Sequence, residues 1–247
     1  MSNTRNIIVA VGGASSSGKT TIAKILHSLI PSSILVHQDD FFKNDKEIPV
    51  DPESGYANWD CPEAIDLEAF SKELDYLKQQ GQRSNDHSKT YDSDTKDQNI
   101  DIKDEKLLSG IQTGLNTIIN DKHLKIIFVD GFMLYHDKTL IDKYDIKVFL
   151  MSNFQTLKNR REARAGYVTQ EEFWVDPPLY FEKIVYPSYV SSHGYLFQTG
   201  DPDTCLPEER VCLELGVMAK SNNDGVDTVE GVLQWCGEVL ERELVNI

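Results

Sequence analysis

The sequence predicts a three-layer α/β fold in which one parallel sheet carries helices on both faces. Segments with apolar residues at helical spacing alternate with short, almost continuous apolar runs, which is the pattern of parallel strands buried on both sides. The runs lie at 6–12, 34–36, 124–130 and 145–150. A glycine-rich stretch separates the first run from the first helical segment, as expected where a strand turns directly into a helix.

The helices are predicted from apolar spacing and from start and stop signals. Pro31 ends the first helix, and the second begins after Asp66 as N-cap and stops at Gly81. The apolar faces are Ile22, Ile25, Leu26, Leu29 and Ile30; Leu67, Phe70, Leu74 and Leu77; Leu107, Leu108, Ile111, Leu115, Ile118 and Ile119; and Val226, Val229, Leu233, Cys236, Leu240 and Leu244. We therefore expect helices between the strands and a closing helix near the C-terminus.

Length and composition favour one domain, residues 1–247, because 40% of the 247 residues are hydrophobic and can form a sizeable core. Residues 81–101 have almost no apolar content, and we expect a mobile surface insertion there. No run of about 18 apolar residues occurs, and the N-terminus lacks the apolar core of a secretory signal. These features predict no membrane partner and a cytoplasmic location, with the nucleus as a further compartment.

Charge and cysteine content narrow the partners. The formal net charge of -15 leaves no basic surplus for binding nucleic acid, so a small ligand is favoured. The cysteines have no metal-binding spacing and are expected to be free thiols; they are Cys61, Cys205, Cys212 and Cys236. Nothing in the sequence determines the oligomeric state.

The strongest signal is GASSSGKT, directly after the first strand. It matches the phosphate-binding P-loop pattern G-x-x-x-x-G-K-[ST] in the required strand-turn-helix context. Its members are Gly13, Ala14, Ser15, Ser16, Ser17, Gly18, Lys19 and Thr20. The glycines allow a tight turn, and the small side chains let backbone N–H groups surround phosphate oxygens at a helix N-terminus. Lys19 is expected to reach the β- and γ-phosphates, and the Thr20 hydroxyl to bind Mg²⁺.

A P-loop can serve a kinase, a GTPase switch or an ATP-driven machine. A GTPase also needs a DxxG switch and an NKxD base-reading loop, and neither is found, since Asp130 is followed by GFM. A small-molecule kinase needs a carboxylate base, a second acidic group near the metal and cations over the transferred phosphoryl group. The sequence has candidates for all three.

These candidates lie at or beyond the predicted strand ends, which converge around the phosphate loop in such folds. They are Asp39 and Asp40 at the end of the second strand, Asp130 at the end of the third, and Arg160, Arg161 and Arg164 on a helix after the fourth. Because neighbours in an extended strand point to opposite faces, we assign the chemistry to Asp39 and a structural role to Asp40. The arginines fit a solvated helix face and a lid equally well.

Six motifs follow one another along the chain: GASSSGKTT, HQDDFF, NWDCPEA, VDGFMLY, RREARAGY and DPPLYF. As a set they closely resemble the nicotinamide riboside kinases of the fungal type, within the P-loop nucleoside kinases, and the match covers most of the chain. The first motif is shared by all P-loop kinases, whereas HQDDFF and NWDCPEA narrow the choice.

This resemblance implies a P-loop NTPase fold with a small lid at about 153–178. It also implies transfer of the γ-phosphoryl group of ATP to the 5′-hydroxyl of nicotinamide riboside, and of nicotinic acid riboside, for NAD biosynthesis. The implied ATP contacts are the eight P-loop residues with Thr21, Arg160 and Arg164. The implied riboside contacts are Asp39 as base, Asp60 on the ribose hydroxyls, Trp59 and Tyr167 around the pyridine ring, and Arg161. The implied Mg²⁺ ligands are Thr20 and Asp39, with Asp130 as a candidate for contact through water.

The residues support one of these implications directly. The pyridinium of nicotinamide riboside is a cation, and an aromatic face beside carboxylates favours it by about 0.5 to 2 kcal/mol. For Trp59 the alternative is an ordinary packing role, because tryptophan is usually largely buried.

The chain departs from its relatives at three places. Trp59 stands where related enzymes often have tyrosine, Gly166 lengthens the step from Arg164 to Tyr167, and the 81–101 insertion has no counterpart in the shorter animal enzymes. Two other functions stay open: a uridine or cytidine kinase, and a non-catalytic nucleotide-dependent binding protein.

Overall fold

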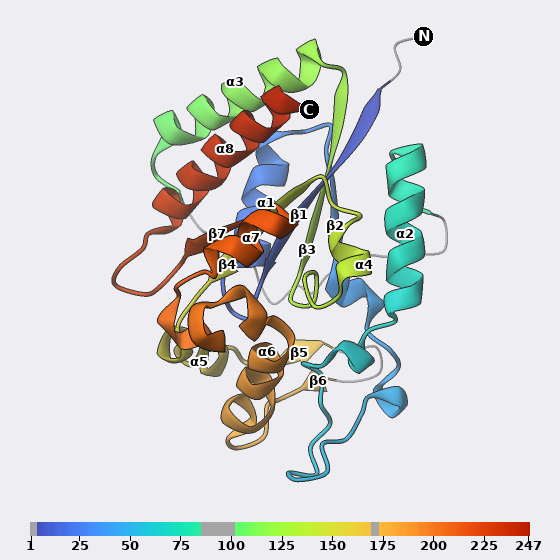
Figure 1. The fold of residues 1–247 in the computed structure, drawn as a ribbon, viewed down its shortest axis with the longest axis vertical. Helices are drawn as coiled ribbons and strands as arrows, with labels where there is room; N and C mark the ends of the chain where they lie inside the picture. The colour runs from blue at the N-terminus through green and yellow to red at the C-terminus, as the bar shows by residue number, and fades with distance from the viewer. Residues whose placement is uncertain (1–3, 85–101, 169–172) are drawn as a thin grey trace.

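A computed structural model describes residues 4–84, 102–168 and 173–247. Its centre is a five-stranded, all-parallel sheet in the order β2-β3-β1-β4-β7 (Figure 1). The strands are β1 (Arg5–Gly13), β2 (Ile34–His37), β3 (Leu124–Gly131), β4 (Ile146–Met151) and β7 (Val217–Ser221). The predicted α/β class and parallel sheet are therefore confirmed.

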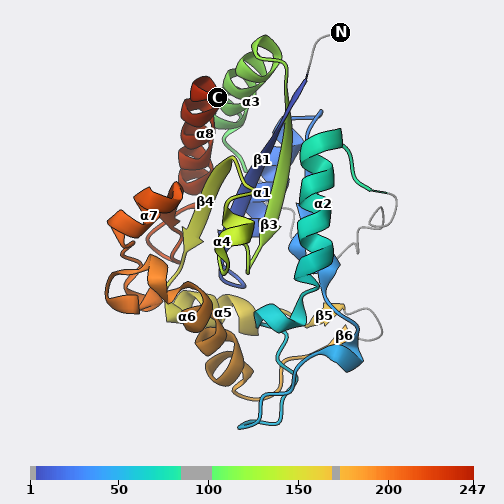
Figure 2. The same cartoon turned by 45° about the vertical axis from the view of Figure 1, so that its right-hand side comes forward.

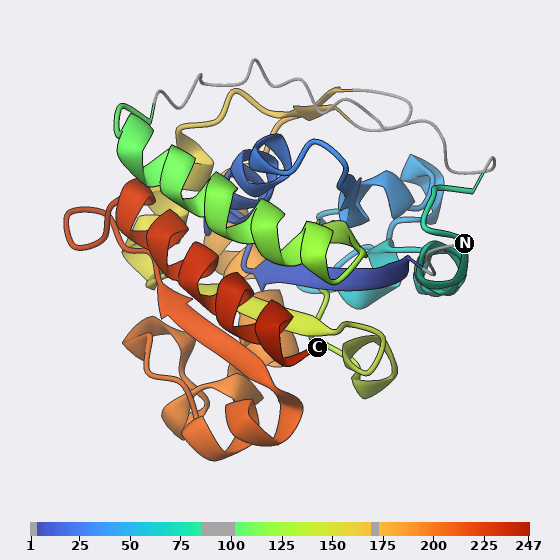
Figure 3. The same ribbon diagram turned by 90° about the horizontal axis from the view of Figure 1, so that it is seen from above.

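Helices cover both faces of the sheet, because the strands are apolar on both sides. Ile7, Val9 and Val11 of β1 pack toward one face, and Ile8 and Ala10 toward the other. The first face carries α1 (Lys19–Leu29), α3 (Glu105–Asp121) and α8 (Val229–Asn246). Figure 3 shows α3 and α8 side by side. The second face carries α2 (Leu67–Gln80), α4 (Lys138–Ile141), the π-helical turn η5 (Phe181–Val185) and α6 (Tyr186–His193).

The carboxyl ends of the strands all face the same end of the molecule. Figure 2 shows them directed toward α5 (Phe154–Glu162), α6 and a small antiparallel hairpin. The hairpin pairs β5 (Tyr167–Val168) with β6 (Phe173–Trp174). A further helix, α7 (Glu209–Leu215), leads into β7. The loops that leave the strands therefore meet at one edge of the sheet.

Most predicted element signals act as expected. The Asp66 carboxylate accepts the Ala69 N–H at 2.9 Å and caps α2, and Gly81 ends that helix in the left-handed conformation at φ 64°. Helix α1 ends at Leu29, two residues before Pro31. Val226 lies outside α8 and is exposed, so the predicted start of that helix was too early.

Two predictions about local geometry were wrong. Asp39 and Asp40 do not end an extended strand, because β2 stops at His37 and both aspartates lie in the 3₁₀ helix η1 (Gln38–Phe41). Alternation along a strand therefore does not apply to them. Arg164 does not share a helix with the other two arginines, because α5 ends at Glu162. Of the predicted insertion, residues 85–101 lie outside the described part of the chain.

In the part of the chain that the structure describes, no helix combines the length and the apolar character needed to cross a bilayer.

Candidate active site

The P-loop joins β1 to α1 in a conformation that depends on left-handed residues. Gly13, Ser16 and Gly18 have φ angles of 150°, 69° and 89°. A β-carbon at Gly13 would collide with the backbone carbonyl of Leu150, so glycine is required there. Gly18 caps α1 without a side-chain hydrogen bond, which leaves the first N–H groups of the helix directed into the loop. The loop has the geometry of an anion cradle.

Thr20, in the first turn of α1, is bonded to the end of β3. Its hydroxyl donates to Asp130 Oδ2 at 2.5 Å, and the ring nitrogen Nδ1 of His37 is bonded to Asp130 Oδ1. Burial acts to raise the pKa of Asp130, but the hydrogen bond and charge of His37, with Lys19 and Thr20, outweigh it and lower that pKa. Asp130 is therefore a buried, ionised carboxylate beside the P-loop.

The charges of Lys19 and Asp39 interact beside Asp130. Lys19 is 7% exposed; burial lowers its pKa, while the charges of Asp39 and Asp130 partly offset that effect. The Asp39 side chain is open to solvent, and yet desolvation by the surrounding protein raises its pKa against the charge of Lys19. Asp39 is thus accessible to water, while the surrounding protein still disfavours its charged form.

Asp40, the other aspartate of η1, is buried and paired. Arg83 Nη2 donates to Asp40 Oδ2 at 2.7 Å. Burial raises the pKa of Asp40, and the arginine opposes that shift. The two neighbouring aspartates thus have different surroundings, because Asp39 is exposed and Asp40 is in an ion pair.

Arg161 is the most enclosed of the three arginines, with 5% of its residue surface exposed. Two of its nitrogens donate to the two carboxylate oxygens of Asp60, at 2.9 and 3.2 Å. Two further bonds, of 2.6 and 3.1 Å, reach Asp176, and one of 3.0 Å reaches the Ser15 hydroxyl of the P-loop. Burial acts to lower the pKa of Arg161, but the carboxylates raise it well above its ordinary value. This residue ties the P-loop, the NWD turn and the segment after β6 together.

The other two arginines are more accessible. Arg160 pairs with Asp224 at 2.7 Å and donates to the Ser16 carbonyl oxygen at 3.4 Å. Arg164 donates to the Tyr167 hydroxyl at 3.1 Å, and its guanidinium lies 5.3 Å from the centre of that ring. Arg160 therefore contacts the P-loop directly, and the charge of Arg164 acts on Lys19.

The two predicted ring contacts differ in their surroundings. Tyr167 is half-buried, and its ring also lies 4.8 Å from the Arg161 guanidinium. Trp59 is 9% exposed and packs against the rings of Phe42 and Trp174, at 5.5 and 6.0 Å between centroids. Trp174 is the strand partner of Tyr167 in the hairpin, so it links the two predicted ring contacts through the backbone. Trp59 has the surroundings of a packing residue.

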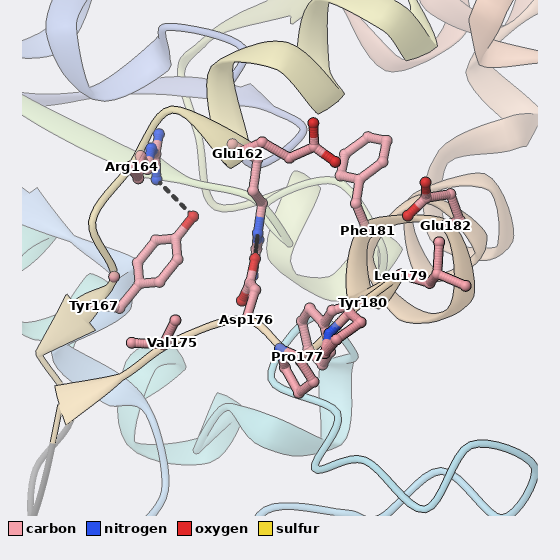
Figure 4. A pocket seen from close by; sticks show the side chains of 13 residues that line it. Glu162, Arg164, Tyr167, Val175, Asp176, Pro177, Leu179, Tyr180, Phe181 and Glu182 are labelled. Atoms are coloured by element: carbon pink, nitrogen blue, oxygen red, sulfur yellow. Dashed lines mark hydrogen bonds and ion pairs between the residues drawn. The ribbon is translucent and has the colours of Figure 1, made fainter.

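Two cavities are lined in part by predicted site residues. The first cavity has a volume of about 260 Å³ (Figure 4). Arg164 and Tyr167 line one side of it, and the segment from Val175 to Glu182 lines the other. It is lined by three predicted site residues, including Arg161, and by no P-loop residue. A second cavity of about 10 Å³, lined in part by Ser15 and Asp60, has room for about one water molecule.

The first comparison with known proteins is with a family model. The model of the phosphoribulokinase and uridine kinase family matches residues 8–164. This range includes the P-loop, Asp39, Asp60, Asp130 and the three arginines.

Comparison with individual proteins narrows the family. A nicotinamide riboside kinase of Saccharomyces cerevisiae is 37% identical over 243 residues, which cover 98% of each chain. The chain belongs to the nicotinamide riboside kinase family. A second member, from Schizosaccharomyces pombe, is 43% identical over 213 residues, or 85% of this chain and 88% of that one. Nicotinamide riboside kinase 2 of Mus musculus is 27% identical over 241 residues, or 97% of this chain and 98% of that one.

Sequence reasoning missed three residues of this site. His37 is the first residue of HQDDFF and Asp176 the first of DPPLYF, two motifs that carry the family resemblance, but the sequence analysis gives neither a role. Arg83 lies at the edge of a polar stretch and had no signal at all. In each case the missing information was the partner, since the bonds reach Asp130, Arg161 and Asp40 from distant parts of the chain.

Proposed function

We propose that the protein transfers the γ-phosphoryl group of ATP to the 5′-hydroxyl of nicotinamide riboside, and of nicotinic acid riboside, forming the mononucleotide for NAD biosynthesis. The observation that carries the proposal is the gathering of Lys19, Thr20, Asp39 and Asp130 at one edge of the sheet. The near full-length match to kinases named for this riboside supports the choice of acceptor.

In this proposal Asp39 accepts the proton of the riboside hydroxyl while the hydroxyl oxygen forms its bond to phosphorus and the bond to the ADP oxygen breaks. Lys19 and the P-loop N–H groups hold the phosphates. Arg160 and Arg164 supply positive charge near the transferred group. Asp60 keeps oxygen lone pairs for the ribose hydroxyls while Arg161 fixes its orientation. Trp59 and Tyr167 border the pyridine ring.

The side chains present fit Mg²⁺. The Thr20 hydroxyl donates its hydrogen bond to Asp130, so the lone pairs of the hydroxyl oxygen are available to a cation. Asp39 offers a second oxygen donor, and Mg²⁺ is commonly held by one or two carboxylates together with substrate phosphates. Among the described residues, no three His, Cys, Asp or Glu side chains are grouped so that they could hold a metal ion. Mg²⁺ bound by Thr20 and Asp39 would neutralise charge on the phosphates. Asp130 would orient the Thr20 hydroxyl through its hydrogen bond.

The proposal includes the whole chain, 1–247, as one kinase domain and 153–178 as its lid. It also includes a cytoplasmic or nuclear location, because both compartments are reducing and the four cysteines are free.

A riboside panel tests the proposal. Turnover is measured with nicotinamide riboside, nicotinic acid riboside, uridine and cytidine, each with ATP and with GTP, and the Lys19→Met variant corrects for contaminating kinases. We expect the pyridine ribosides to have the higher kcat/KM. A higher kcat/KM for uridine or cytidine would make the protein a pyrimidine nucleoside kinase. Consumption of neither nucleotide with any riboside would leave a nucleotide-dependent binding protein.

A further inference from the structure

Arg83 and Asp40 form an ion pair that is nearly enclosed by the protein. Their side chains are 15% and 3% exposed, and the bond between them measures 2.7 Å. A buried carboxylate is tolerated only when it is paired, so Asp40 depends on this arginine. Asp40 also follows Asp39 directly in the chain, and the two share the single turn of η1.

The backbone that carries Arg83 is itself held in place. Gly81 closes α2 with a bond from its N–H to the Leu77 carbonyl oxygen at 2.9 Å. The N–H of Ser84 donates to the Glu73 carboxylate at 3.1 Å, and Glu73 is buried in α2. Arg83 therefore reaches Asp40 from a chain that is fixed to α2 on both sides of it.

The turn η1 ends on a long hydrogen bond, 3.4 Å, from the Phe42 N–H to the Asp39 carbonyl oxygen. Contacts to other elements also hold the turn. Gln38 accepts the Met133 N–H at 2.8 Å, on the side that precedes Asp39.

On the side that follows Asp39, the buried Phe41 ring packs against Phe70 at 5.1 Å between centroids, and two polar contacts add to the support. The Phe41 carbonyl oxygen accepts the Asp66 N–H at 2.8 Å, and Asp40 is bound by Arg83. Of these supports, the one adjacent to Asp39 on this side is the ion pair. Its loss would leave a charged, buried side chain next to Asp39, and rotation of the turn toward water would relieve that charge.

We propose that Arg83 is a positioning residue of the phosphotransfer reaction, which holds η1 through Asp40 so that the Asp39 carboxylate meets the riboside hydroxyl. The inference rests on the proposed role of Asp39 as base. It assigns a function to the start of the polar 81–101 stretch. A displacement of about 1 Å at a reacting group costs about 100-fold in rate, so a small shift of the turn is enough.

Kinetics of Arg83 variants test the proposal. Arg83→Met removes the charge and keeps most of the length, whereas Arg83→Lys keeps the charge. Turnover is expressed per ATP-binding site, counted by calorimetry, so that unfolded protein does not contribute. We expect Arg83→Met to lower kcat about 10- to 100-fold with ATP affinity unchanged, and Arg83→Lys to restore most of the loss. As a matched control, Lys143→Met removes an ion pair to Asp75 of the same helix α2 and should leave kcat unchanged.

A double-mutant cycle separates the ion pair from other effects of Arg83. In an Asp40→Asn background the buried charge is gone, so Arg83→Met should cost several-fold less in kcat than it does in the wild type. An equal cost in both backgrounds would overturn the proposal, as would wild-type kcat per site in Arg83→Met.

Hydrogen exchange gives a readout that does not depend on any substrate. Amide exchange of a peptide spanning 37–43 should become faster in Arg83→Met and stay unchanged in Lys143→Met. Unchanged exchange in Arg83→Met would show that Arg83 does not hold the turn. A wild-type protein that phosphorylates no riboside would refute the proposed function instead, and the exchange result would still decide whether Arg83 holds η1.

Discussion

The Thr20 hydroxyl and the Asp130 carboxylate are joined by a 2.5 Å hydrogen bond between the first turn of α1 and the end of β3. The second oxygen of Asp130 is bonded to His37 at the end of β2. One carboxylate therefore connects three elements that leave the sheet at the same edge. Since it accepts the Thr20 proton, it also determines where the free lone pairs of that hydroxyl lie.

Replacing Asp130 by asparagine should weaken Mg²⁺ use. Asparagine keeps one acceptor oxygen and replaces the other by an NH₂ donor, so Thr20 and His37 can no longer each be bonded to a carboxylate oxygen, and the hydroxyl loses its fixed orientation. We expect the Mg²⁺ concentration for half-maximal turnover to rise about 10- to 100-fold, the usual cost of losing a group that orients a metal ligand. Titration of turnover with Mg²⁺ at saturating ATP measures this. An unchanged titration would show that Asp130 does not orient Thr20.

Replacing Asp39 by asparagine should nearly abolish turnover and leave nucleotide binding intact. The amide cannot take the proton of the riboside hydroxyl, and loss of a general base costs about 100- to 10,000-fold. Steady-state kinetics measures the loss of turnover, and calorimetric titration of the same preparation with ATP measures nucleotide binding. Asp40→Asn is the matched control in the same turn and should cost less. Undiminished turnover in Asp39→Asn would remove Asp39 from its role.

Elements of the fold could be predicted where their own residues carry a pattern, and not where the structure depends on distant residues. Strands β1 and β3 are apolar on both sides, so their composition alone identifies them. The edge strand β7, with sequence VMAKS, is half-solvated and has no such run, and the strands of the hairpin are two residues long. None of these was predicted. The sequence predicts the end of a strand where η1 lies, because nothing in HQDDFF distinguishes an extended strand end from a 3₁₀ turn.

The same distinction applies to the site, where a continuous motif is predictable and long-range contacts are not. The P-loop is one continuous motif, and it was predicted residue by residue. The environment of Arg161 was not, because its carboxylate partners lie 101 and 15 residues away in the sequence. Spacing placed the three arginines on one helix, but only the fold shows that Arg161 is enclosed by Asp60 and Asp176 while Arg160 stays accessible.

Replacing Arg161 by methionine should destabilise the protein strongly. The change leaves Asp60 buried without its partner, and breaking a buried ion pair by removing one member costs about 3 to 5 kcal/mol. Urea unfolding followed by circular dichroism measures the free energy of unfolding. Arg160→Met is the matched control, because its pair with Asp224 is partly exposed and should contribute less than about 1 kcal/mol. Equal losses in the two variants would contradict the assigned burial of Arg161.

The fold should also lose stability in acid through His193, a residue remote from the P-loop in sequence. His193 ends α6, is 1% exposed and stacks on Phe149 with ring centroids 5.7 Å apart. Burial lowers its pKa from 6.5 to about 3. The unfolded chain therefore takes up a proton near pH 6.5, whereas the folded protein does so only near pH 3.

Below pH 6.5 protonation of His193 stabilises the unfolded chain relative to the folded protein. The free energy of unfolding therefore has its full value above pH 6.5 and falls by up to about 1.4 kcal/mol per pH unit as the pH falls toward 3. His193→Leu removes the titrating group and keeps a similar volume. The free energy of unfolding of the wild type minus that of the variant should therefore fall by about 2 to 3 kcal/mol between pH 7 and pH 4.5, measured by urea titration at each pH. A constant difference for His193→Leu would show that the folded protein protonates His193 as readily as the unfolded chain does.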